Sequence, residues 1–78
     1  MPTVHRIRAY RFFFYGNENN KPPHIHAQRD RCLAKFWLAP ASLAKVKGFS
    51  PHEIPRLAKM VEANENRFLE AWSEFFAT

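Results

Sequence analysis

A chain of 78 residues is long enough for one domain but too short to bury a large core, so its stability margin is small. A single cysteine excludes an internal disulfide. A membrane-spanning helix needs about 20 apolar residues in a row, and every apolar run in this sequence is much shorter. A hydrophobic content of 46% argues against disorder, and the low cysteine usage without a signal peptide predicts a cytoplasmic protein.

The net charge of +5 is concentrated in the first half of the chain. Residues 1–38 hold seven cations against two acids, whereas residues 39–78 hold five of each. Such an excess of cations steers anions, RNA or an acidic partner toward the first half. The same net charge also falls in the range that keeps a small domain soluble, so both interpretations stay open.

The first half predicts strands between about residues 3 and 38. TVHRIRAYRFFFY begins with alternating residues and ends in aromatics, both of which are typical of strands. GNENNKPP has the composition of a loop. HIHAQR alternates again, and CLAKFWL is the last strand. The short connection between these two strands predicts an antiparallel hairpin.

The second half predicts helices over about residues 40–76. PASLAKVKG, residues 40–48, is typical of a short helix. Pro40 stands at its start, and Gly48 suits a left-handed stop.

A long C-terminal helix follows. Ser50 is its predicted N-cap and Glu53 the matching capping-box residue. An apolar stripe at helical spacing then extends from Ile54 to Phe76, as expected for core packing. Polar residues interrupt this stripe at Asn64, where a break into two helices is an alternative.

Together these elements predict an α+β fold in a single domain, residues 1–78. It comprises an antiparallel sheet of about four strands, with the short helix and the long C-terminal helix packed on one face. RFFFY and AKFWL are apolar on both faces of their strands, yet one helical layer covers only one face. Because large exposed apolar patches mark interfaces, we expect a homodimer or a dedicated partner protein.

The stretch KPPHIHAQR carries the candidate chemistry. His24 and His26 are two residues apart and therefore share one face of a strand. If Ala34 and Phe36 point to the core, Lys35 and Trp37 lie beside the histidines.

Three interpretations follow. A histidine that moves protons, next to a cation that holds phosphate, suits metal-independent RNA cleavage, with His24, His26 and Lys35 as catalytic candidates. The two histidines could instead bind a metal, although stable zinc sites use three or four ligands. In the third interpretation they hydrogen-bond to the backbone after the double proline and shape the loop.

Basic and aromatic residues on strands also suit nucleic-acid or partner binding, although core packing explains most of the aromatics. The candidates are Arg6, Arg8, Arg11, Arg29, Arg31, Trp37 and Tyr15. The sequence has no phosphate-cradling glycine loop, nucleophile elbow or CxxC motif, so we expect no cofactor.

The chain resembles a family of small bacterial proteins known as domain of unknown function 4160. The residues that carry the resemblance are MPTVHRI, RFFFYGNENNKPPHIHAQ, AKFWL, GFSPHEI and NRFLEAW. The resemblance implies a toxin-like component of a bacterial toxin–antitoxin module, encoded beside a small partner protein. It makes Pro22, Pro23, His24 and His26 signature positions but brings no catalytic assignment.

We therefore expect a toxin-like protein that acts on RNA through its His-x-His surface and pairs with a small antitoxin-like protein. The alternative is a non-catalytic module that binds protein or nucleic acid on a basic, aromatic face. A metal-binding domain, with His24 and His26 as ligands, is the third hypothesis.

Overall fold

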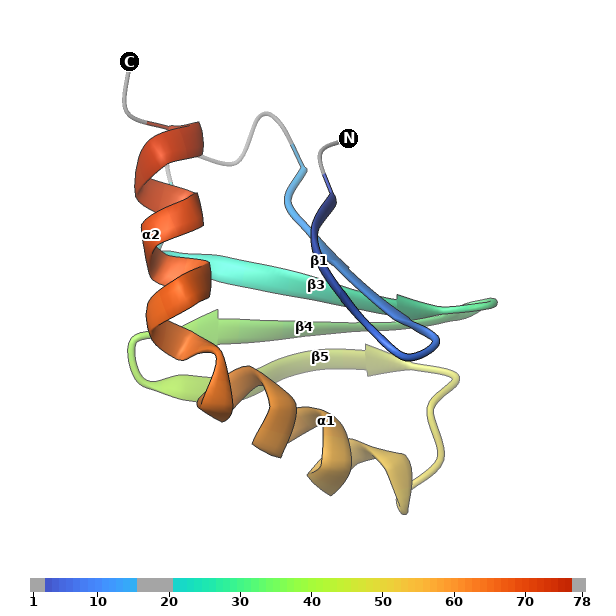
Figure 1. Cartoon of the computed structure of the whole chain (residues 1–78). Helices are drawn as coiled ribbons and strands as arrows, with labels where there is room; N and C mark the ends of the chain where they lie inside the picture. The colour runs from blue at the N-terminus through green and yellow to red at the C-terminus, as the bar shows by residue number, and fades with distance from the viewer. Residues whose placement is uncertain (1–2, 16–20, 77–78) are drawn as a thin grey trace.

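The computed structural model describes residues 3–15 and 21–76, and this part of the chain forms five strands and two helices (Figure 1). The elements are β1 (Thr3–Ile7), β2 (Tyr10–Phe13), β3 (His24–Arg29), β4 (Cys32–Leu38), β5 (Ala41–Lys47), α1 (Glu53–Ala63) and α2 (Glu65–Phe75). Each strand pairs antiparallel with the next, giving the sheet order β1-β2-β3-β4-β5. The predicted α+β fold is confirmed, with five strands instead of about four.

The short helix that the sequence predicted over residues 40–48 is wrong, because this segment forms the edge strand β5. Leu43 and Val46 are three positions apart, which is a helical spacing. In the structure Leu43 lies opposite Phe36 and Val46 opposite Ala34, so three steps on β5 match two on β4. This β-bulge turns both apolar side chains to one face. Pairing with β4 prevails over helix propensity because the β4 edge would otherwise leave backbone groups without a partner strand.

Gly48 ends β5 in the left-handed conformation, with a φ of 90°. The left-handed conformation was predicted correctly, but Gly48 ends a strand and not a helix. A Cβ atom at this position would lie 3.1 Å from the Sγ atom of Cys32. Both the backbone conformation and the close approach therefore favour glycine.

The C-terminal segment is divided into α1 and α2 at Asn64, the point where the apolar stripe is interrupted. The Asn64 side-chain amide donates a hydrogen bond to the Met60 carbonyl (2.8 Å). At the start of α1, the Ser50 Oγ atom accepts a hydrogen bond from the Glu53 backbone N–H (3.3 Å), which is one bond of the predicted cap. The helix itself begins at Glu53, with His52 and not Ser50 at the N-cap position, so the predicted N-cap is wrong by two residues. No helix in the described ranges is long and apolar enough to span a membrane.

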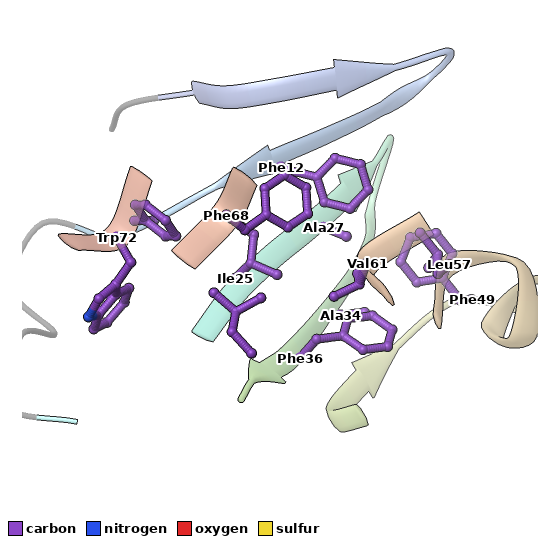
Figure 2. Packing of buried hydrophobic residues seen from close by; sticks show 12 residues of the cluster. Phe12, Ile25, Ala27, Ala34, Phe36, Phe49, Leu57, Val61, Phe68 and Trp72 are labelled. Carbon is purple, nitrogen blue, oxygen red and sulfur yellow. The ribbon is translucent and has the colours of Figure 1, made fainter. Parts of the chain in front are cut away.

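The hydrophobic core lies between one face of the sheet and the two helices (Figure 2). Its fully buried side chains come from both layers. They include Phe12, Ile25, Ala27, Phe36 and Leu38 from the sheet and Leu57, Val61 and Phe68 from the helices. Burial of each large apolar side chain contributes about 1.5–3 kcal/mol, so this layer is a large favourable contribution to folding.

Glu53 joins the first helix to the sheet. Arg29 on β3 donates to both of its carboxylate oxygens, from Nε to Oε2 (3.0 Å) and from Nη2 to Oε1 (2.7 Å). The Tyr10 hydroxyl donates to Oε2 as well (2.9 Å). The hydrogen bond from Arg29, followed by that from Tyr10, lowers the pKa of the Glu53 carboxyl. Burial, followed by the hydrogen bond to Glu53, raises the pKa of Tyr10.

A second carboxylate ties α2 to the sheet. The Glu65 Oε1 atom, in the first turn of α2, accepts a hydrogen bond from the Ala41 backbone N–H (3.0 Å). The N-terminal turns of both helices thus use a glutamate to hold the sheet. Both helices pack on the same face, since their buried side chains join one core cluster with the sheet.

Acid should weaken the protein through Glu53. Its pKa is lower in the folded state, so its contribution is complete above the unfolded value of about 4.3 and disappears as pH falls through the lowered folded value. In urea titrations from pH 7 down to pH 3, Glu53→Gln should reduce the pH dependence of the unfolding free energy. Glu62→Gln makes the same charge change at an exposed position of α1 and should retain the wild-type dependence. Equal slopes for Glu53→Gln and wild type would contradict this assignment.

Candidate nucleic-acid interface

The face of the sheet opposite the helices, here called the open face, carries three rows of side chains that cross neighbouring strands. Residues paired between antiparallel strands point to the same side, so the register defines each row. The first row is Arg6, Arg11, Gln28, Leu33 and Lys47. The second is Phe13, His26, Lys35 and Lys45, and the third is His24, Trp37 and Ser42. The register confirms that Lys35 and Trp37 lie beside the histidines.

His24 is fully buried at the start of β3. Its Nδ1 atom lies 2.9 Å from the Pro22 carbonyl oxygen, which only accepts hydrogen bonds, so Nδ1 carries the proton. The imidazole also contacts Trp37 edge-on, with ring centroids 5.8 Å apart, and Trp72 of α2 at 4.9 Å. His24 thus makes the backbone contact after the double proline that the third interpretation expects.

His26 lies in the middle of an aromatic cluster on the open face. Its ring stacks on Phe13 at 5.4 Å and meets Tyr15 edge-on at 4.5 Å. Only 6% of His26 is exposed, and Phe13 is 1% exposed. The apolar residues of the second face therefore pack largely on one another. Aromatic pairs of this kind add about 0.5–1.5 kcal/mol each beyond their buried area.

A cavity of about 590 Å³ lies beside His26 on the open face. Its wall contains four lysines from three parts of the chain: Lys21, Lys35, Lys45 and Lys47. His26 and Leu33 complete the open-face part of the wall. Lys45 and Lys47 are exposed, and neither forms an ion pair within the described part of the chain. The cavity is therefore suited to anionic groups.

Within the described ranges, the acidic residues lie outside the rows of this face. Among the described residues, the acids are Asp30 in the β3–β4 turn and Glu53, Glu62, Glu65, Glu70 and Glu74 on the helices. Five cations, by contrast, stand in the rows of the open face: Arg6, Arg11, Lys35, Lys45 and Lys47. The fold thus places cations on the open face of the sheet and most of the described acids on the helices.

The structure brings together only some of the binding residues predicted from the sequence. Arg6, Arg11 and Trp37 lie on the open face, and Tyr15 contacts its aromatic cluster. Arg29 points to the helix face, where Glu53 binds it.

Two predicted arginines lie in turns. Arg8 and Arg31 are exposed in the β1–β2 and β3–β4 turns, which lie at the same end of the sheet. They extend the basic surface beyond the three rows. Their exposure leaves both guanidinium groups accessible to an anionic partner.

Sequence reasoning missed Lys45 and Lys47. The helix predicted over residues 40–48 removed them from the sheet and from the histidines. The alternation of Lys45 and Lys47 was the available signal, since residues two apart share a strand face. No group of three or more potential metal ligands occurs in the two ranges that the structure describes.

The comparison with protein families matches residues 9–73 to the model described as "Domain of unknown function (DUF4160)". The chain belongs to this family. The match includes β2, β3, β4 and β5, and so most of the open face of this DUF4160 protein. Comparisons with curated proteins and with solved structures gave no match.

Removal of the His24 side chain should destabilise the DUF4160 protein. His24→Ala empties a fully buried position of aromatic size, so we expect a loss of about 2–5 kcal/mol of unfolding free energy in urea titrations. His52 is exposed and makes no side-chain cap, so His52→Ala should stay within about 0.5 kcal/mol of wild type. Equal stability of both variants would show that the His24 imidazole is not part of the packing.

Proposed function

We propose that this DUF4160 protein binds single-stranded RNA on its open face. The observation that supports the proposal best is the sorting of charge. Five cations share that face, and every described acid lies in a turn or on a helix. Sheet faces that combine cations with aromatic side chains bind single strands by neutralising phosphates and stacking on bases.

The cations are placed where they repel one another. Lys35 lies directly opposite Lys45. Like charges in such cross-strand pairs destabilise a sheet. An anion bound between them would remove this repulsion, so the arrangement favours the bound state. Solubility alone does not require paired cations on one face.

The toxin-like role implied by the family resemblance fits this proposal as its cellular consequence. A protein that binds RNA strongly would slow growth when it is produced in excess, and an acidic partner covering the open face would suppress that effect. Such a partner would need acidic side chains opposite the cations of β4 and β5. We therefore propose that the protein binds RNA and that this binding causes the toxicity.

RNA binding should depend on Lys45 and Lys47. With a labelled oligouridylate of about 12 nucleotides, fluorescence anisotropy should give a logarithmic affinity that falls linearly with the logarithm of salt concentration. Lys45→Gln/Lys47→Gln should weaken binding at least tenfold at low salt and reduce that slope by about 1.4, or about 0.7 for each phosphate that the protein no longer neutralises.

The control for this experiment is Lys59→Gln, which removes one cation from an exposed position of α1. It should leave both affinity and slope close to wild type. A duplex of equal length should bind more weakly, because its bases are not available for stacking. Equal losses from Lys59→Gln and from each of Lys45→Gln and Lys47→Gln would refute the open face as the RNA site.

RNA cleavage is a second candidate function, and one specific observation favours it. His26 and Lys35 are direct cross-strand partners and line the same cavity. A phosphate held there by lysines would lie near an imidazole able to move a proton.

Cleavage has a direct test. Purified protein incubated with end-labelled RNA in EDTA should produce fragments that His26→Ala and Lys35→Gln abolish, while circular dichroism shows both variants folded. His52→Ala should cleave as wild type does. Intact RNA after long incubation at saturating protein would eliminate cleavage and leave the binding proposal in place.

A further inference from the structure

A second hollow lies next to the lysine cavity. It has a volume of about 290 Å³ and is lined by Pro22, Pro23, Trp37, Ala39, Pro40 and Ser42. Three of these residues are prolines, whose rings are rigid and whose nitrogens carry no hydrogen-bond donor. Trp37 provides an aromatic wall. The lining therefore offers flat apolar surfaces and little hydrogen-bonding capacity.

The two hollows are neighbours along the same strands. Lys35 lines the cavity and Trp37 lines the proline hollow, and the two residues are two positions apart on β4. This places them on one face, about 6.6–6.8 Å apart along the strand. Their partners on β5 follow the same order, with Lys45 opposite Lys35 and Ser42 opposite Trp37. The lysine cavity and the proline hollow are thus side by side.

We propose that the two hollows form one nucleotide site, with a phosphate in the lysine cavity and the adjoining base against Trp37. This inference rests on the proposed RNA binding and adds to it the placement and the mode of base recognition. A wall of prolines and one indole holds a base by stacking and by apolar contact. Such a site accepts different bases, because every base has a flat face and few edge contacts are available.

Lys35 connects the two parts of the site. Its Nζ atom lies 4.6 Å from the centre of the Trp37 ring, in a cation–π contact, while the same residue lines the cavity. When a base stacks on the indole, the ammonium group moves from the ring to the phosphate and keeps a favourable contact throughout. His24 holds the ring edge from within the sheet, with centroids 5.8 Å apart. His24 is therefore a positioning residue, and Trp37 and Lys45 are the groups that touch the nucleotide.

The test uses Trp37 as its own reporter. The chain has two tryptophans, so Trp72→Phe leaves Trp37 as the sole source of indole fluorescence. Two probes of equal length are titrated at low salt: an oligouridylate, and an abasic oligonucleotide that has the phosphates without the bases. The oligouridylate should quench Trp37 and bind about tenfold more tightly than the abasic strand, a ratio within the range of base stacking.

Substitutions then test the contributions of the lysine cavity and the proline hollow one at a time. Trp37→Leu should abolish the preference for the oligouridylate but retain salt-dependent binding of the abasic strand. Trp37→Phe, which keeps an aromatic ring, should retain part of the preference. Lys45→Gln should weaken both probes by the same factor, since both carry phosphates.

Two outcomes would overturn the inference. Equal affinity for the two probes, with unchanged Trp37 fluorescence, would remove the nucleotide site while RNA binding by the lysines stands. Absence of binding to either strand at low salt would remove the proposed function itself, and the nucleotide site with it. Both comparisons use the full-length chain and need no Trp37 variant, and the affinities of the two probes are measured on the wild type as well as on Trp72→Phe.

Discussion

A sheet has two faces, and in the described chain two helices of 11 residues each are available to cover them. Glu53 and Glu65 hold the starts of both helices against the sheet, and the helices lie on the same side. The buried helical side chains Leu57, Val61 and Phe68 are thus used on one face, while Trp72 also contacts His24 and Phe75 stays exposed. In the described part of the chain no helical layer packs over the other face, and the composition of that face is consistent with this arrangement.

The open face has two parts. Toward β2 and β3 its aromatic residues pack on one another, with the rings of Phe13, Tyr15 and His26 in mutual contact. Toward β4 and β5 it becomes polar, and lysines surround a cavity. The histidines therefore stand at the boundary between an aromatic cluster and a basic hollow. The His24 imidazole combines both properties of this boundary, because its ring packs against Trp37 while its Nδ1 atom hydrogen-bonds to the Pro22 carbonyl.

The same boundary links structure to the proposed function. His24 fixes the end of β3 through the Pro22 carbonyl and supports the Trp37 ring. His26 forms part of the wall of the lysine cavity. The His-x-His element therefore builds the two hollows from within the sheet. The described acids lie in a turn or on the helices, so Lys45 and Lys47 form no ion pair within the described ranges, which is the charge arrangement on which the proposed RNA binding rests.

Much of this organisation was readable from single residues and their neighbours. Alternation in HIHAQR and CLAKFWL predicted the central hairpin, and the placement of Lys35 and Trp37 beside the histidines followed from it. The polar interruption at Asn64 predicted where the helical segment breaks, and Ser50 predicted its start to within two residues. These signals are local, since each depends on residues within one or two turns or on one strand pair.

Only the tertiary structure decided the rest. Residues 41–47 have the spacing and the composition of a helix, and they form a strand because the edge of β4 needs hydrogen-bond partners. That pairing brings Lys45 and Lys47 to the histidines and completes the cavity. The burial of His24 and the binding of Arg29 by Glu53 likewise depend on residues distant in the chain. The sequence by itself determined the local elements and which residues share a strand face. The site depended on long-range pairing, which local propensity does not encode.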